Sequence, residues 1–292
     1  MDIEANRPWR LQTSVQYPGI PACGVPTSRV SLAPFPVSSL GQVTPQWAWQ
    51  NARGAGVRVC ILDSGIDASH PMIGAVDRAM AVAFEEDAPR VVPVPAMDTT
   101  GHGTACGGII RSIAPEVSLS SMRILTDATA GTGRALLAGL EWAIEEGFNV
   151  INLSVATTRL QFSEPLYKLA DRAYFRRCLL VVSAHNLAVP SFPWSFASVL
   201  SVASHDEPDP LLHYYNPSPP VEFLGRGVGV PVAWANGRQI RSSGNSLAAA
   251  HISGLCALIL SKHPWLTPFQ LKSVLFLTAR NVAGAPPTSP VH

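Results

Sequence analysis

The chain has 292 residues, of which 47% are hydrophobic and 14% are charged, and its formal net charge is +1. This composition can supply a sizeable core in one or two domains. The near-neutral charge argues against binding nucleic acid or a membrane surface through basic patches. No apolar run approaches the roughly 20 residues needed to cross a bilayer, so we expect no membrane partner.

The first 41 residues are predicted to form an N-terminal arm or a short pro-segment. Prolines recur there and hydrophobic periodicity is weak, which is typical of extended or partly disordered sequence. The opening MDIEANRPWRLQ lacks the basic start and apolar centre of a secretory signal, and the five cysteines show no CxxC spacing. We therefore expect a cytoplasmic location with reduced thiols. Residues 42–285 should form the main domain and 286–292 a tail.

From about residue 42, apolar β-branched runs alternate with helical segments. Strands are expected over 57–63, 117–125, 148–155, 178–184 and 199–204, and helices over 103–113, 133–147, 163–177, 244–260 and about 267–280. Strands that alternate with helices of about 10–15 residues form βαβ units around a parallel sheet. The expected fold class is therefore α/β, with functional groups gathered beyond the carboxyl ends of the strands.

Asp63 stands at such a position, and His102 is a second candidate for a functional role. Asp63 ends the run VRVCILD and is followed by Ser64-Gly65. Its carboxylate can accept a hydrogen bond from an imidazole, or it can simply cap a turn. His102 lies between two glycines in GHGT, directly before a predicted helix. Its ring can project into a cleft, or it can be a surface histidine in a glycine turn.

Ser246 lies near the start of the apolar segment GNSLAAAHISGLCALIL, residues 244–260. A serine at a helix start is often only an N-cap. Here Gly244 and the alanines at 248–250 leave space around the hydroxyl, and the helix N-terminus directs backbone N–H groups toward it. Such a hydroxyl can attack a carbonyl if a base removes its proton and an acid orients that base.

The order Asp63, His102, Ser246 is that of subtilisin, and the chain from about 42 to 282 resembles the subtilisin-like serine proteases, or subtilases. The segments that carry the resemblance are QWAWQNARGAGVRVCILDSGID, DTTGHGTACGGII, GTGRALLAGLEWAIEEGFNVINLSV, VVSAHNLAVPSFPWSFASVLSVAS and SGNSLAAAHISG. The resemblance implies a three-layer subtilisin-like fold, with a mostly parallel central sheet and helices on both faces. It also implies a serine endopeptidase that acts on peptides or proteins and uses no cofactor.

By this resemblance, Ser246 is the nucleophile, His102 the general base and acid, and Asp63 the residue that orients the imidazole. Asn186 falls on the oxyanion-hole asparagine. The strand carrying Gly131 and Gly133 should pair with an extended peptide. The residues implied to contact substrate are Gly131, Thr132, Gly133, Ser154, Val155, Ala156, Ser183, Ala184 and His185.

Several positions depart from the family pattern. Asn245 and Ala250 replace the usual threonine and proline of the serine motif, and both are small enough to keep the helix start. Ala105 replaces a second histidine, and the adjacent Cys106 is similar to the thiol-bearing, proteinase K-like branch. The connection 111–113 is too short for the calcium-binding loop of many secreted subtilases, so we expect no metal site there.

The cleft walls also depart from the family pattern. Ala156 and His185 stand where glycine is usual, and Trp194 stands where a small residue is common. A shallow or unusual first specificity pocket is expected. Three interpretations follow: a selective endopeptidase, a dedicated processing protease that removes a leader from one partner peptide, and a catalytically silent peptide-binding module. The sequence says nothing of the oligomeric state.

Overall fold

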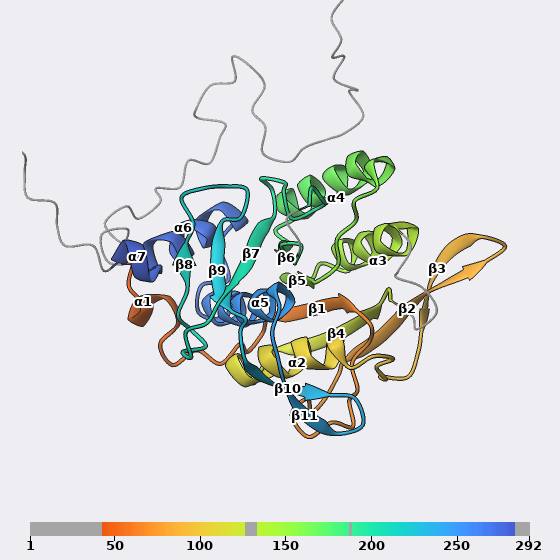
Figure 1. Cartoon of the computed structure of the whole chain (residues 1–292), viewed down its shortest axis with the longest axis horizontal. Helices are drawn as coiled ribbons and strands as arrows, with labels where there is room; N and C mark the ends of the chain where they lie inside the picture. Colours follow the sequence, from red (N-terminus) through yellow and green to blue (C-terminus); the bar gives the residue numbers. More distant parts are fainter. Residues whose placement is uncertain (1–42, 126–132, 187–188, 284–292) are drawn as a thin grey trace, which may run out of the picture. The chain divides into compact units, whose positions relative to one another are not determined.

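The computed structural model describes residues 43–125, 133–186 and 189–283 (Figure 1). The predicted arm and tail lie outside these ranges, as do Gly131 and Thr132. None of the helices within them has the length and apolar character required to cross a bilayer.

A nine-stranded sheet in the order β3-β2-β4-β1-β5-β6-β7-β9-β8 forms the centre of the described part. Its strands are β1 (Arg58–Asp63), β2 (Arg78–Glu85), β3 (Ala88–Pro93), β4 (Ser118–Arg123), β5 (Val150–Leu153), β6 (Leu179–Ser183), β7 (Leu200–His205), β8 (Tyr214–Tyr215) and β9 (Phe223–Arg226). The outer strands β3 and β8 pair antiparallel, and the strands between them pair parallel. A separate antiparallel pair joins β10 (Val230–Trp234) to β11 (Arg238–Ser242).

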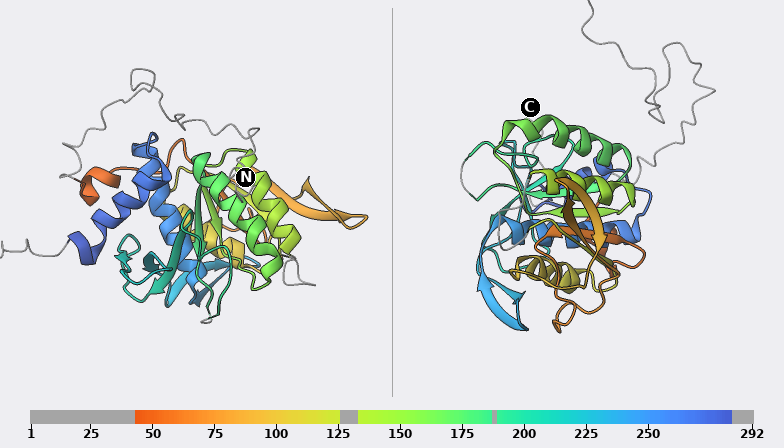
Figure 2. Two further views of the ribbon diagram at one scale, coloured as in Figure 1. Left: turned by 90° about the horizontal axis from the view of Figure 1, so that it is seen from above. Right: turned by 90° about the vertical axis from the view of Figure 1, so that its right-hand side faces the viewer.

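Helices cover both faces of the sheet, which confirms the predicted α/β class (Figures 1 and 2). The helices are α1 (Pro45–Trp49), α2 (His102–Ile113), α3 (Gly133–Glu145), α4 (Ser163–Phe175), α5 (Asn245–Lys262), α6 (Pro268–Thr278) and α7 (Arg280–Ala283), with a 3-10 turn η4 (Leu160–Phe162). One apolar cluster packs α2 and α5 against the sheet, and a second packs α3 and α4 against the opposite face. Because α5 is apolar on all sides, it is buried throughout from Ser246 to Leu260.

The alternation of side chains along the central strand β1 determines the face of the sheet on which Asp63 lies. Val59 and Ile61 belong to the cluster of α2 and α5, whereas Cys60 and Leu62 belong to the cluster of α3 and α4. Side chains alternate between the faces of a strand. Asp63 therefore has the parity of Val59 and Ile61 and ends β1 on the face that α2 and α5 cover.

Each strand and helix predicted from the sequence corresponds to an observed element with bounds within a few residues. The β2–β3 hairpin, the strands β8 to β11 and the short helix α1 were not predicted. The residues of β3 are exposed or half-buried. They lack the continuous apolar pattern that marks the central strands.

Candidate active site

Asp63 is the last residue of β1, and its side chain is fully buried. Its Oδ1 accepts a hydrogen bond from the Ser64 backbone N–H at 2.7 Å. The start of α2 packs directly on this strand end, because Gly103 has no side chain. A Cβ at Gly103 would lie 2.0 Å from the carbonyl oxygen of Gly65. The glycine after the histidine is therefore required for the approach of α2 to the acid.

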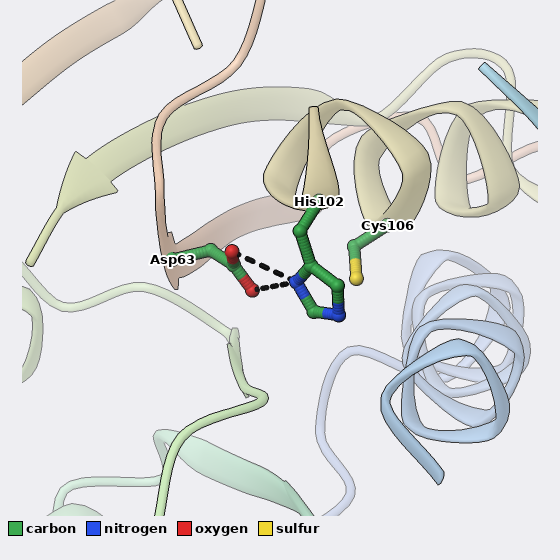
Figure 3. A group of neighbouring side chains, drawn as sticks. All are labelled: Asp63, His102 and Cys106. Atoms are coloured by element: carbon green, nitrogen blue, oxygen red, sulfur yellow. Dashed lines mark hydrogen bonds and ion pairs between the residues drawn. The ribbon is translucent and has the colours of Figure 1, made fainter. Parts of the chain in front are cut away.

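His102 is the first residue of α2, and its imidazole faces Asp63 (Figure 3). The His102 Nδ1 lies 2.9 Å from Asp63 Oδ1 and 2.8 Å from Oδ2. The negative charge of Asp63 raises the pKa of His102 above its ordinary value, although burial of the ring acts in the opposite direction. Because Nδ1 bonds to the acid, Nε2 points away from it and is left to exchange protons with another group.

Asp98 fixes the loop that presents His102, a role that the sequence did not reveal. Its Oδ1 accepts from the backbone N–H groups of Thr100 and Gly101, at 2.9 and 2.8 Å, and from Ser64 Oγ at 2.7 Å. Its Oδ2 accepts from the backbone N–H and the hydroxyl of Thr104. Gly101, the N-cap of α2, has no side chain to cap the helix, so a carboxylate three residues earlier supplies the acceptor.

Ser246 is the second residue of α5 and is 7% exposed. Its carbonyl oxygen lies 3.9 Å from the sulfur of Cys106, which is one turn after His102 on α2. The Cys106 sulfur, one carboxylate oxygen of Asp63 and one ring nitrogen of His102 lie within 4.8 Å of one another. Asp63, His102 and Ser246 are therefore brought to one place from β1, α2 and α5.

The hydrogen bonds of the described residues do not include one from Ser246 Oγ to His102 Nε2. In enzymes without bound substrate, catalytic hydrogen bonds are often long and shorten only in the complex. The contact between Cys106 and the Ser246 carbonyl places the start of α5 beside α2.

Asn186 is exposed and lies next to the start of α5. Its Oδ1 accepts a hydrogen bond from the Asn245 backbone N–H at 3.1 Å. A Cβ built on Gly244 would lie 4.0 Å from Asn186 Nδ2, from Asn186 Oδ1 and from the Ser246 backbone nitrogen. Since the N–H groups of the first helical turn have no carbonyl partner within the helix, two donors border the same small space beside Ser246.

The remaining residues implied to contact substrate are distributed around this centre. Gly133 starts helix α3 and is not in a strand; its missing Cβ leaves room for the Phe162 ring, 2.2 Å from the position a Cβ would take. Ser154 directly follows β5, and its Oγ lies 3.9 Å from the Cys106 sulfur. Val155 and Ala156 continue this segment toward the antiparallel bridge between Thr157 and Phe192.

Ser183 ends β6, and the two residues after it line a cavity of about 670 Å³. Other residues that line this cavity are Asn186, Phe192, Trp194 and Asn245. Ser154, Val155 and Ala156 do not line it.

Asp63, His102 and Cys106 also have the arrangement of a small metal-binding group (Figure 3). A cysteine binds metal, or attacks a carbonyl, as its thiolate. Burial raises the pKa of Cys106 well above its ordinary value, and the charge of Asp63 raises it further. The thiol therefore stays protonated, and it serves as a packed side chain between α2 and α5.

Comparison with known proteins agrees with this geometry. Residues 54–289 match the subtilase family. The chain is 30% identical over 248 residues to subtilisin DY from Bacillus licheniformis, covering 80% of this chain and 87% of that protein. It is 27% identical over 245 residues to subtilisin E from Bacillus subtilis strain 168, covering 79% of this chain and 62% of that protein.

Two solved structures share the fold. One is a cold-adapted subtilisin-like serine proteinase, with a TM-score of 0.63, 24% identity and coverage of 77% of this chain and 82% of that one. The other is a lanthipeptide protease, with a TM-score of 0.65, 24% identity and coverage of 77% and 81%. The protein class is thus that of the subtilisin-like serine endopeptidases, hydrolases that cut peptides or proteins. The chain belongs to the subtilase family.

Proposed function

We propose that this chain cleaves peptide bonds with Asp63, His102 and Ser246 as its triad, and that Asn186 and the Ser246 backbone N–H form its oxyanion hole. The observation that carries the proposal is the fully buried carboxylate of Asp63 within 2.9 Å of His102 Nδ1. A buried acid that bonds one ring nitrogen selects the tautomer whose other nitrogen accepts a proton. The position of Ser246 at the start of α5 supports its role as the group that gives up this proton.

The reaction follows from these positions. His102 Nε2 takes the proton of Ser246 Oγ while Oγ bonds to the scissile carbonyl carbon, and Asp63 stabilises the imidazolium that forms. The carbonyl oxygen becomes an oxyanion, to which Asn186 Nδ2 and the Ser246 N–H donate. His102 then protonates the leaving amine as the C–N bond breaks. Water, activated in the same way, releases the acid product and restores Ser246.

We also propose that the enzyme accepts only a narrow range of substrate side chains, as a processing protease does. Trp194 lines the cavity beside Asn186, and its indole N–H donates to the buried Ser191 Oγ at 2.7 Å. This bond holds a large ring in place, so the ring excludes bulky side chains from its part of the cavity. His185 also lines this cavity.

A diverse peptide library, digested by the purified protein and by its Ser246→Ala variant, tests both parts of the proposal. We expect cleavage by the first protein alone, after a small set of residue types. Efficient cleavage after many residue types would contradict the selectivity. Peptide binding without any cleavage would instead show a catalytically silent binding module and would contradict the enzyme.

A further inference from the structure

We propose that Asn245 is a positioning residue, which holds the amide of Asn186 in the orientation that an oxyanion needs. The inference rests on the proposed function, because it assigns to Asn245 a role that acts through Asn186. Asn245 is the first residue of α5, immediately before Ser246. It is half-buried and borders the same cavity as Asn186.

The backbone of Asn245 sets which end of the Asn186 amide faces the site. Its N–H donates to Asn186 Oδ1 at 3.1 Å. With the oxygen held in this way, the Nδ2 group is directed to the other side, where it can donate. An amide that turned by 180° would present its oxygen and would repel an oxyanion, so this single bond selects the productive orientation.

The side chain of Asn245 fixes the segment on which Asn186 is carried. Its Nδ2 donates to the carbonyl oxygens of Ala184 and His185, at 3.2 and 3.4 Å. These two residues connect the end of β6 to Asn186. A donor group on α5 therefore holds the two peptide units that precede the oxyanion-hole residue.

The other end of the same side chain is anchored to the neighbouring strand. Asn245 Oδ1 accepts from the backbone N–H of Ser204 at 3.0 Å and from its hydroxyl at 2.9 Å. Ser204 lies in β7. One carboxamide thus links the segment after β6, strand β7 and the start of α5. A threonine or alanine at this position has no group that could bond both to the two carbonyls and to Ser204.

These bonds of Asn245 fix the distance between the two proposed oxyanion donors, Asn186 Nδ2 and the Ser246 N–H. Asn186 is exposed, and its own contacts do not bury it. Without the carboxamide of Asn245, the peptide units of Ala184 and His185 lose these two bonds. The Asn245 N–H still bonds Asn186 Oδ1, but the segment that carries Asn186 can then shift relative to the Ser246 N–H. Catalysis depends steeply on such positions, since a shift of about 1 Å can cost about 10²-fold in rate.

The experiment uses a fluorophosphonate, because its reaction needs no knowledge of the natural substrate. Ser246 Oγ bonds to phosphorus, fluoride leaves, and the serine proton passes to His102, while the phosphoryl oxygen lies in the oxyanion hole. The inactivation rate constant kinact and the binding constant KI are measured for wild type, Asn245→Ala, Asn186→Ala and the double variant. Asn245→Thr is a second variant in case the alanine variant does not fold.

Asn281→Ala is the matched control, because Asn281 also bonds a backbone N–H and a carbonyl through its carboxamide, both of Tyr215 in β8. We expect Asn186→Ala to lower kinact about 10²-fold and Asn245→Ala to lower it about 10-fold with KI nearly unchanged. In the Asn186→Ala background, Asn245→Ala should change kinact less than about 2-fold. The control should lower the melting temperature without lowering kinact.

The inference is overturned if Asn245→Ala lowers kinact by the same factor in both backgrounds, since the effect would then not pass through Asn186. It is also overturned if Asn245→Ala leaves kinact at the wild-type value. If Asn186→Ala itself has no effect, the oxyanion hole of the proposed function is wrong together with this inference. The single variant of Asn186 therefore separates the failure of the two proposals.

Discussion

His102 determines how the proposed reaction depends on pH. The charge of Asp63 raises the pKa of His102 above 6.5, against the effect of burial. Only the neutral imidazole can take a proton from Ser246. We therefore predict that kcat/KM rises with pH through a midpoint above 6.5, in a pH–rate profile on any cleaved peptide. A profile that is flat between pH 5 and pH 9 would contradict the assignment.

The interaction of Asp63 with His102 also makes the free energy of unfolding depend on pH, and this contribution falls as the pH rises. A group whose pKa is raised by folding contributes stability that is fully present below its unfolded pKa, about 6.5 for histidine. This contribution of His102 is lost as the pH rises through its folded pKa. The enzyme is thus expected to be most active where the ion pair of Asp63 and His102 contributes least to stability.

Replacing Asp63 by asparagine should separate these effects. The charge that raises the pKa of His102 is removed, so the acidic limb of the pH–rate profile moves to lower pH. The amide also favours the wrong tautomer of the ring, and turnover is expected to fall by about 10⁴. The measurement is the profile of Asp63→Asn beside that of wild type. Unchanged turnover would show that Asp63 does not orient the imidazole.

At the scale of elements, Arg111 joins the end of α2 to two loops. Its guanidinium donates to the carbonyl oxygens of Ile73, Ala75, Pro115 and Val117, at distances of 2.8 to 3.1 Å. Pro115 and Val117 lie in the connection between α2 and β4, whereas Ile73 and Ala75 lie in the loop before β2. The guanidinium donates a hydrogen bond to each of these four carbonyl oxygens.

We predict that Arg111→Ala lowers the free energy of unfolding by about 2–3 kcal/mol, because it leaves these carbonyls unpaired. Urea denaturation measures this change, and Arg111→Lys is the matched control, since lysine keeps the charge without the planar fork. A chelator such as EDTA should leave the midpoint of wild type unchanged. A large loss of stability in EDTA would show that a metal ion supports this region instead.

The elements that the sequence predicted are those with a strong apolar pattern. β1, β5 and β6 are almost continuously buried, and α5 is apolar on all sides. The hairpin of β2 and β3 was missed because many of its residues are exposed or half-buried. Its turn has positive φ at Glu86 and Asp87, but it lacks the glycine that usually marks such a turn in a sequence.

The site was predictable to the extent that its residues lie in local motifs. Asp63 and His102 were placed by the segments around them, and their side chains are indeed bonded. The roles of Asp98 and Asn245 were not predictable in this way. Their hydrogen bonds join positions 34 and 41 residues apart, such as Ser64 with Asp98 and Ser204 with Asn245. Only the packed strands bring these partners together.

At the scale of the whole molecule, buried neutral histidines make the fold sensitive to acid. Burial lowers the pKa of His251 to about 4, and the nearby charges of Arg226 and His205 act in the same direction. Burial also lowers the pKa of His213. In the unfolded chain, His213 and His251 bind a proton near pH 6.5. In the folded chain, they bind it only at lower pH. Stability from this source is therefore present above pH 6.5 and is lost as the pH falls toward 4.

For His251 alone, this difference amounts to about 3 kcal/mol between pH 7 and pH 4. Urea denaturation at both values should show the loss, and a His251→Gln variant should show a smaller one. Glutamine cannot titrate and can still donate to the carbonyl of Leu247, which His251 Nδ1 bonds at 2.8 Å. An equal loss in both proteins would show that His251 does not contribute to the acid sensitivity.

The central claim is that the acid, the imidazole and the hydroxyl of Asp63, His102 and Ser246 act as one unit. The most direct measurement is to treat the folded protein with a fluorophosphonate, locate the adduct by peptide mapping, and compare its rate of formation in wild type and His102→Ala. We predict a single adduct on Ser246, formed at least about 10³-fold more slowly without the imidazole. An unlabelled Ser246, or labelling at the wild-type rate in His102→Ala, would contradict the claim.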